Sequence, residues 1–329
     1  MTAVSDAMPA IAASVPPGAD TAILLALYNG APHLQAQLES FTAQSFQDWE
    51  LIVSDDGSTD EGLAILQAWA ARHQDMGQRP HRLTLLQGPQ QGFVGNFFHL
   101  LRHVPATARH AALSDQDDVW FAEKLARARE ALAAVPSDRP ALYCARSLIT
   151  DEKLRPLRLS TRFTRPAAFP NALVQSIGGG NTMVLNRAAI DLVREAVLEA
   201  QDVAAHDWWL YQLITGAGGV VLRDPEAVLQ YRQHGGNAIG ANTSLKARLH
   251  RILFIMGRRF SSWNEINLRA LAASAHRFTP EARASLEAYA AARRGGLRAR
   301  LCALRHSGAY RQSSLGTLAL YIACIARRL

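Results

Sequence analysis

The sequence predicts an α/β protein in which a mostly parallel, doubly wound sheet is followed by a basic helical extension. In the first half of the 329-residue chain, apolar runs of strand length alternate with segments whose apolar residues recur at helical spacing. Polar clusters directly follow three of the strand-like runs, as expected at the carboxyl edge of a parallel sheet. A hydrophobic content of 49% is ample for a large core.

The elements of this half follow one another in order. Residues 21–27 are almost continuously apolar, which favours a strand covered on both faces, and Asn29-Gly30 ends it. Leu34, Leu38 and Phe41 then recur at helical spacing. Further strands are predicted at 49–53, 83–86 and 111–113, and further helices at 63–69, 93–104 and 121–134.

The second half is less regular. Residues 155–170 are rich in Pro and Arg and predict a mobile loop. Strands are predicted at 182–185 and 218–222, helices at 191–199 and 207–213, and a flexible loop at 233–237. From residue 245 the pattern is helical, with breaks near Gly257, Pro280, Gly295-Gly296 and Gly308. We therefore expect a flexible lead (1–19), a catalytic-type α/β domain (20–244) and a helical extension (245–329).

Composition excludes several classes of protein. The Ala/Pro-rich lead lacks the basic start of a signal peptide. No run reaches the roughly 18–20 apolar residues that span a bilayer. Cys144, Cys302 and Cys324 share no close spacing, so neither a metal motif nor a disulfide framework is predicted, which fits a reducing compartment.

Charge is distributed unevenly along the chain. Residues 245–329 hold 16 basic residues against three Glu, a net charge of +13, and because the whole chain carries +7, residues 1–244 carry −6. A basic tail on an acidic body indicates an anionic partner. Bases interleaved with Leu, Ile and Phe favour amphipathic helices on an anionic membrane, and a packing or oligomerisation appendage is the alternative. Nucleic acid is a weaker option, because no nucleic-acid motif appears.

The most informative run is Asp115-Gln116-Asp117-Asp118, directly after an apolar strand. Three carboxylates within four residues repel one another unless a cation is present, and a hard divalent ion such as Mg²⁺ or Mn²⁺ is the natural partner. Asp55-Asp56 ends an earlier strand, so the two acidic clusters should meet at one sheet edge. The alternatives are an acidic turn at 115–118 and a helix cap at 55–60.

These segments, taken in order, resemble the family 2 glycosyltransferases with the GT-A fold. The resemblance covers about residues 20–240 and rests on LYNG (27–30), VSDDGSTD (53–60), GPQQGFVGN (88–96), SDQDDVW (114–120) with Lys124-Leu125, HDWW (206–209) and YRQHGGN (231–237). The segments SDQDDVW and YRQHGGN are most similar to those of bacterial rhamnosyltransferase-type members, which build surface polysaccharides.

The resemblance implies a role for each matching residue. Nucleotide-binding residues would be Tyr28, Asn29, Asp55, Asp56, Asn96 and Asp115, with Asp55 or Asp56 accepting a hydrogen bond from the ring N–H of uracil or thymine. Metal ligands would be Asp115, Asp117 and His234, although a structural role for His234 is equally open. Asp118 would orient the ligands or cap the helix that follows.

The resemblance also implies a general base and a sugar site. Asp207 would take the proton of the acceptor hydroxyl, with a helix cap as the alternative; family members often have Glu-Asp where this chain has His206-Asp207. The sugars would contact Gly179, Gly180, Asn181, Trp208 and Trp209. For the glycines a bend is the alternative, and for one of the adjacent Trp a place in the core.

The function implied is inverting, metal-dependent transfer of a sugar from a nucleotide donor to a hydroxyl. L-Rhamnose from dTDP-rhamnose is the expected donor, with UDP-sugars open, and the expected acceptor is a glycan or polyprenyl-diphosphate-linked acceptor in surface polysaccharide synthesis. We expect a cytoplasmic protein, peripheral at the inner face of the cytoplasmic membrane. Two alternatives are an aspartyl-phosphate-type phosphatase, whose Asp-x-Asp-x-Val pattern matches Asp115–Val119 but belongs on a first strand, and a non-catalytic nucleotide-sugar-binding protein.

Overall fold

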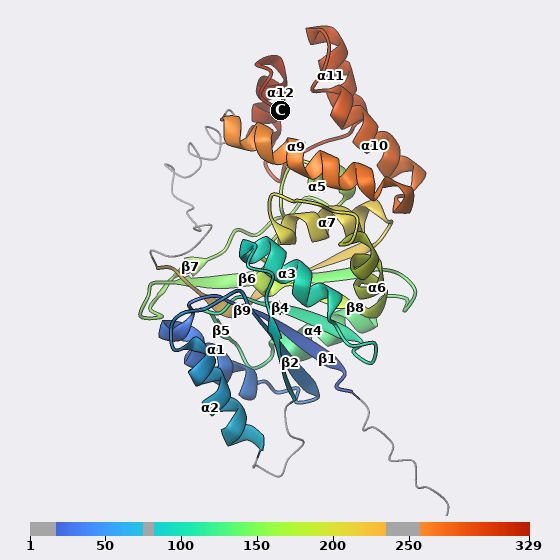
Figure 1. Cartoon of the computed structure of the whole chain (residues 1–329). Helices are drawn as coiled ribbons and strands as arrows, with labels where there is room; N and C mark the ends of the chain where they lie inside the picture. Colours follow the sequence, from blue (N-terminus) through green and yellow to red (C-terminus); the bar gives the residue numbers. More distant parts are fainter. Residues whose placement is uncertain (1–17, 75–81, 235–256) are drawn as a thin grey trace, which may run out of the picture.

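One sheet divides the molecule into two layers of helices, and a third group of helices covers one of those layers (Figure 1). The computed structural model describes residues 18–74, 82–234 and 257–329. Within them, the sheet has nine strands: eight follow the order β3-β2-β1-β4-β8-β6-β9-β5, and the ninth, β7, pairs with β6. The α/β class is therefore confirmed.

The elements have the following bounds. The strands are β1 (Thr21–Leu27), β2 (Trp49–Asp55), β3 (Leu83–Gln87), β4 (His110–Ser114), β5 (Val119–Trp120), β6 (Ala141–Thr150), β7 (Pro156–Leu159), β8 (Val184–Asn186) and β9 (Val220–Arg232). The helices are α1 (Ala31–Thr42), α2 (Gly62–Gln74), α3 (Gly92–Arg102), α4 (Lys124–Ala133), α5 (Phe169–Ala172), α6 (Arg187–Ala196), α7 (His206–Gly216), α9 (Arg258–Ala273), α10 (Pro280–Ala291), α11 (Leu297–His306) and α12 (Ser314–Ile325).

The sheet is mixed and not uniformly parallel. The four strands predicted in the first half, β1 to β4, pair in parallel, as the alternation of strands and helices predicts. The sheet reverses at β8, which is antiparallel to both β4 and β6, while β9 again runs parallel to β6. The two-residue β5 pairs antiparallel with β9 and ties the chain just after Asp118 to the far side of the sheet.

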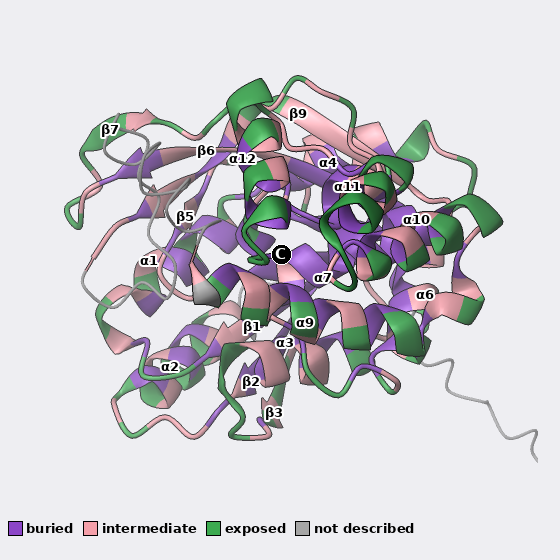
Figure 2. Cartoon of the chain, turned by 90° about the horizontal axis from the view of Figure 1, so that it is seen from above, coloured by how far each residue is buried: buried purple, intermediate pink, exposed green. Residues whose placement is uncertain are grey.

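Strand β1 shows why its sequence is apolar throughout. Ala22 and Leu24 belong to the core beneath α3, α6 and α7, whereas Ile23, Leu25 and Leu27 belong to the core shared with α1, α2 and α4. Successive side chains of a strand point to opposite faces, so a strand covered on both sides has no polar face. Figure 2 shows the resulting buried central strands.

The C-terminal helices pack on the α/β body. Their buried residues share one core with α7, and the ring of Trp263 on α9 lies 6.4 Å from that of Trp208. The ring of Phe278 lies 5.3 Å from that of Phe169, and Arg277 forms an ion pair with Glu199. The inner face of the tail therefore packs against the body, as the packing alternative predicts.

Most predicted elements are confirmed in type. The helix breaks near Pro280, Gly295-Gly296 and Gly308 separate helices, and Gly257 directly precedes α9. Residues 155–170, predicted as a loop, contain β7, and the strand predicted at 218–222 continues to Arg232 as β9. Strand β6 was missed. The expectations for residues 1–17, for 235–237 and for 245–256 lie outside the described residues. Among the helices of the described part, none is both long and apolar enough to cross a membrane.

Candidate active site

A cleft of about 930 Å³ opens at the carboxyl ends of β1 and β4, where the sequence places its polar clusters. It extends from the turn after β1, past the acidic run after β4, to the first turn of α7. Nine of the predicted site residues line it: Tyr28, Asp56, Asn96, Asp115, Asp117, Gly179, Gly180, Asn181 and Asp207. The fold thus brings together residues that lie up to 179 positions apart in the sequence.

The acidic run forms a compact cluster. One carboxylate oxygen from each of Asp115, Asp117 and Asp118 lies within 4.8 Å of the other two. Burial, followed by the negative charges of Asp117 and Asp207, raises the pKa of Asp115 to about 7, against a partial opposing effect of Lys124. The cluster is therefore strained by its own charge, and a bound cation would relieve it.

Asp118 is completely buried and has internal partners. Its Oδ2 accepts a hydrogen bond of 2.5 Å from Asn181 Nδ2, and its Oδ1 one of 3.4 Å from the backbone N–H of Arg232. Buried Lys124 donates to the carbonyl of Asn181 at 2.6 Å, and its Nζ lies 3.0 Å from the centroid of the Trp120 ring. Because α4 begins only at Lys124, Asp118 does not cap it; it holds the acidic run against the segment around Asn181.

His234 completes the cluster from the end of β9. Its Nε2 lies 2.8 Å from Asp117 Oδ2, and its ring centroid lies 4.9 Å from that of His33, a residue that the sequence analysis did not single out. Arg232 fixes this end, since its Nε donates to the carbonyl of Asp117 at 3.0 Å. The three carboxylates lie close enough together to fit a divalent cation of the Mg²⁺ or Mn²⁺ class, and His234 contacts them through Asp117.

Asp207 lies in the first turn of α7 and lines the opposite wall of the cleft. The helix begins at His206 after Ala205, so Asp207 is not the cap that the alternative interpretation required. Burial raises the pKa of Asp207 to about 6, opposed by hydrogen bonds from the backbone N–H groups of Trp208 and Gly180. A carboxylate with this pKa is ionised at neutral pH and suited to accept a proton there.

His206, next to Asp207, was not assigned a role from the sequence. Its side chain is 6% exposed, its ring stacks on Phe97 at 3.9 Å between centroids, and burial lowers its pKa to about 3. Neither ring nitrogen has a hydrogen-bond partner among the described residues. A Cβ built on Gly180 would lie 2.4 Å from Nε2, so only glycine fits opposite this ring.

The end of the cleft nearest β1 is built by backbone contacts. Both oxygens of Asp56 accept hydrogen bonds from the loop before α3: Oδ1 from Gln90 N at 2.6 Å and Oδ2 from Gly92 N at 2.9 Å. Asn96 donates to the carbonyl of Ser54 at 2.9 Å. Asp56 and Asn96 therefore shape this pocket while their remaining acceptor positions face it.

Asn29 and Asp55 do not line the cleft but support its wall. Asn29 adopts a positive φ of 49° and its Oδ1 accepts a 2.8 Å hydrogen bond from Thr59 N, which joins the turn after β1 to the turn after β2. Asp55 accepts hydrogen bonds from Ser58 N at 3.2 and 3.3 Å. Asp60 accepts a hydrogen bond from the N–H of Gly62, so Asp60 is the residue that caps α2.

Gln116 was not predicted, yet it joins the two halves of the cleft. Its Nε2 donates to the carbonyl of Tyr28 at 2.9 Å, and its Oε1 accepts from the N–H of Tyr28 at 2.8 Å. The ring of Tyr28 remains 57% exposed at the rim of the cleft. A Cβ on Gly30 would meet Gln116 Oε1 at 2.6 Å, which explains the glycine after Asn29.

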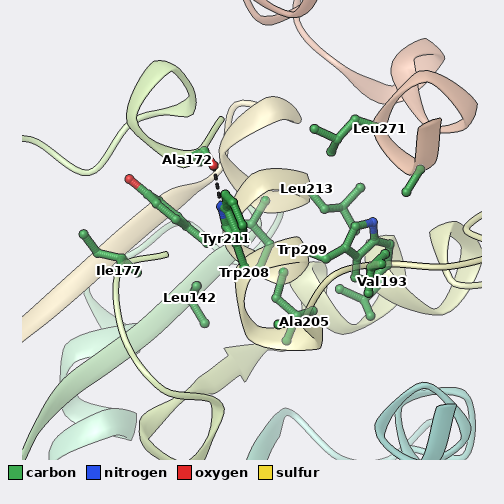
Figure 3. Close-up of a cluster of buried hydrophobic side chains, with 14 of the residues drawn as sticks. Leu142, Ala172, Ile177, Val193, Ala205, Trp208, Trp209, Tyr211, Leu213 and Leu271 are labelled. Atoms are coloured by element: carbon green, nitrogen blue, oxygen red, sulfur yellow. Dashed lines mark hydrogen bonds between the residues drawn. The ribbon is translucent and has the colours of Figure 1, made fainter. Parts of the chain in front are cut away.

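The expectation that Trp208 and Trp209 form a sugar platform is corrected by their position. Trp208 is 5% exposed and its Nε1 donates to the carbonyl of Ala172 at 2.6 Å; Trp209 is fully buried (Figure 3). Neither lines the cleft, because α7 is a central helix whose residues other than Asp207 are all buried. A stacking platform needs an exposed ring face, and both indoles are enclosed by core residues.

We predict that Asp117→Ala weakens Mn²⁺ binding by at least about 10- to 100-fold, the usual cost of losing even an outer partner of a metal ligand. The variant should fold, because removing one charge relieves the repulsion on Asp115. Calorimetric titration with Mn²⁺ measures the effect, and Asp138→Ala in an exposed loop is the matched control. Equal affinities in both variants would remove Asp117 from the ligand set.

A second prediction concerns stability and pH. His206 is neutral when folded, with a pKa of about 3, whereas an unfolded histidine titrates near 6.5, so the unfolded chain binds the extra proton between these values. This contribution to the free energy of unfolding is lost as pH falls from about 6.5, at up to about 1.4 kcal/mol per pH unit. His206→Gln should therefore gain stability relative to wild type on acidification, measured by urea unfolding at several pH values.

The matched control is His306→Gln, at an exposed histidine of α11. Unfolding free energies of His206→Gln that stay a constant distance from those of wild type at all pH values would mean that folding does not shift the pKa of His206.

The chain is similar to several known glycosyltransferases. The chain is 27% identical over 241 residues to the dTDP-rhamnosyl transferase RfbG of Shigella flexneri, which covers 69% of this chain and 78% of that protein. It is 33% identical over 109 residues to the putative glycosyltransferase EpsE of Bacillus subtilis (strain 168), covering 33% of this chain and 36% of that one. Among solved structures, residues 1–349 of S. aureus TarS in complex with UDP-GlcNAc superpose with a TM-score of 0.51 at 14% identity, covering 93% of this chain and 90% of that chain.

The last of these likenesses concerns the fold alone. The family profile is more direct: it matches residues 22–188, which contain both acidic runs, the Gln90–Asn96 segment and the glycines beside Asp207. On this match the chain belongs to glycosyl transferase family 2.

Proposed function

We propose that the protein transfers L-rhamnose from dTDP-L-rhamnose, with inversion, to a hydroxyl of a glycan or a polyprenyl-diphosphate-linked acceptor in surface polysaccharide synthesis. The observation that carries the proposal is the position of Asp207, which faces the acidic cluster across one cleft and is close enough to raise the pKa of Asp115. The similarity to RfbG over 241 residues supports the choice of donor. The phosphatase alternative is not retained, because its motif would follow β4 and not a first strand.

The donor would lie along the cleft with its nucleotide at the β1 end. The exposed ring of Tyr28 offers a face for the base, and Asp56 offers acceptor positions to a ring N–H. Asp115, Asp117 and His234 would hold Mg²⁺ or Mn²⁺, which when bound neutralises charge on the departing nucleoside diphosphate. The sugar would then face Gly179 and Gly180, which line the cleft beside Asp207.

Asp207 would remove the acceptor proton. Its carboxylate accepts that proton as the hydroxyl oxygen attacks the anomeric carbon from the side opposite the diphosphate, and one displacement inverts the configuration. The backbone N–H of Gly180 orients the carboxylate and keeps it ionised. Asn181, held by Asp118 and Lys124, fixes the glycine segment relative to the acidic cluster.

We predict that Asp207→Asn lowers turnover about 10²–10⁴-fold, the usual effect of losing a general base, while donor affinity stays unchanged. A panel of nucleotide sugars, incubated with Mn²⁺, would be assayed for nucleoside diphosphate release, and calorimetry would measure donor binding. Asp202→Asn, an exposed aspartate of the preceding loop, is the control. Turnover within a few-fold of wild type would exclude Asp207 as the base.

The outer surface of α12 supports a peripheral position on an anionic membrane. Leu315, Leu318, Ile322 and Ile325 are 46–67% exposed and recur at helical spacing on one face of the helix. Figure 2 looks down onto this end, where the exposed faces of α11 and α12 lie. Residues 288–329 contain no acidic residue. They include five exposed arginines, of which two directly follow the stripe: Arg294, Arg298, Arg305, Arg327 and Arg328. An apolar stripe bordered by bases fits the interface of an anionic bilayer.

We predict that the full chain co-sediments with anionic vesicles at low salt and is released as salt is raised. Leu318→Glu should reduce vesicle binding by about tenfold or more, since burying a leucine contributes about 1.5–3 kcal/mol. Leu198→Glu, at a leucine that is 68% exposed after α6, is the matched control. Equal binding of the two variants would assign the α12 stripe to assembly with another protein.

A further inference from the structure

A second cavity, of about 440 Å³, lies beside the cleft. Its walls come from the middle of β6, the first half of β9, the segment 161–164 and Ile177. No predicted site residue lines it. Its composition is different from that of the cleft, because three of its lining residues are arginines: Arg146, Arg162 and Arg223.

The positive charge of this cavity is not neutralised from within. Asp224 is the one carboxylate among its lining residues, and it is engaged elsewhere: its two oxygens pair with Arg127 at 2.9 Å and also accept from Tyr143 Oη at 2.7 Å. In the described part of the chain, none of the three arginines forms an ion pair with a carboxylate. Three guanidinium groups around one small cavity repel each other unless an anion lies between them.

Two of the arginines are held in place by the backbone. Arg146 donates through Nε and Nη2 to the carbonyl of Ser160, at 3.0 and 2.7 Å, and Arg223 donates through Nη1 to the carbonyl of Phe163 at 2.9 Å. These bonds fix the direction of both guanidinium groups and leave further N–H groups on each without a partner among the described residues. Arg162 is exposed and makes no side-chain bond within the described residues. Fixed, incompletely used guanidinium groups are the usual means of binding a phosphate.

The cavity shares a wall with the cleft. Ser147 and Ser160 line the cleft, while their chain neighbours Arg146 and Thr161 line the second cavity. The two serines are joined by hydrogen bonds, from Ser147 N to Ser160 Oγ at 3.0 Å and from Ser160 N to Ser147 O at 2.8 Å. The segments that carry Ser147 and Ser160 therefore contribute to both cavities.

The same segment also leads to the surface of α12. Arg165, one residue beyond the cavity lining, donates through Nη1 to the carbonyl of Arg311 at 2.7 Å, and its N–H donates to Gln312 Oε1 at 3.0 Å. These two residues directly precede α12. The segment that lines the cavity thus contacts the residues before α12 on one side and contributes to the cleft on the other.

We propose that the Arg146–Arg162–Arg223 cavity binds a phosphate group of the acceptor and so orients the acceptor hydroxyl toward Asp207. The inference rests on the proposed function for the identity of the acceptor, but the anion site itself does not depend on catalysis. The ligand is a phosphate or diphosphate monoester, carried either by a lipid or by a soluble glycan. Donor phosphates belong to the acidic cluster, which needs a metal to accept them.

The test uses pyrophosphate as the probe, titrated calorimetrically into the full chain in EDTA, so that the acidic cluster holds no metal. Pyrophosphate binding should persist in Asp117→Ala. It should weaken about 10- to 100-fold in Arg162→Gln, because that variant loses one charge-assisted hydrogen bond. Arg162→Gln should fold normally, because the side chain is exposed. Arg109→Gln, at an exposed arginine directly before β4 that does not line the cavity, is the matched control and should bind as wild type does.

Three results would overturn the proposal: no pyrophosphate binding in EDTA, loss of binding in Asp117→Ala, or equal binding by Arg162→Gln and Arg109→Gln. Neutral vesicles with and without a polyprenyl phosphate identify the source. If Arg162→Gln sediments less than Arg109→Gln only with vesicles that contain the lipid phosphate, the acceptor is lipid-linked. If the two variants sediment equally, the acceptor is soluble. A chain that binds pyrophosphate in this way but hydrolyses no nucleotide sugar would retain the site and refute the proposed function.

Discussion

The burial of Asp118 beside two further carboxylates is the constraint on which the site depends. A carboxyl group without solvent needs hydrogen-bond partners, and Asp118 receives them from Asn181 and from the backbone of Arg232. Lys124 is fully buried for the same reason, since its charge offsets the cluster while it holds the carbonyl of Asn181. The end of β9, the segment around Gly180 and the start of α4 are thereby fixed to one point.

This constraint also relates the two walls of the cleft. The segment held by Asn181 supplies the backbone N–H that orients Asp207, so the position of the proposed base follows from that of the acidic run. On the other side, Gln116 fastens the same run to Tyr28. One short loop thus holds together the proposed nucleotide end, the proposed metal site and the proposed base, which come from distant parts of the chain.

The sequence predicts the first half of the fold well, because strands covered on both faces are apolar throughout and end in polar clusters. Strand β6 could not be recognised, since Arg146 and Ser147 interrupt its apolar run to reach the two cavities. Strand β9 contains Asp224, Pro225 and Glu226, where the pairing with β6 shifts register. In both strands, the residues that obscure the pattern are those that line or adjoin a cavity.

Site prediction had the same limit. Acidic runs at strand ends and the Asp of the His-Asp pair are visible as patterns, and they do line one cleft. Gln116 and the arginine cavity are not visible, because their roles arise only where segments meet in space. Trp208 and Trp209 show the opposite error: aromatic residues beside a catalytic-type aspartate suggested a sugar platform, whereas α7 is a central helix that buries both.

The contact between Gly180 and His206 has a consequence for how this family member can diverge. A side chain at position 180 would collide with the imidazole at 2.4 Å, while the backbone N–H of the same residue holds Asp207. A larger residue at position 180 becomes acceptable only if position 206 shrinks or turns away, and a longer residue at 206 needs the glycine to remain. The two positions should therefore change together in descendants of this sequence, and a library that randomises one alone will recover few active proteins.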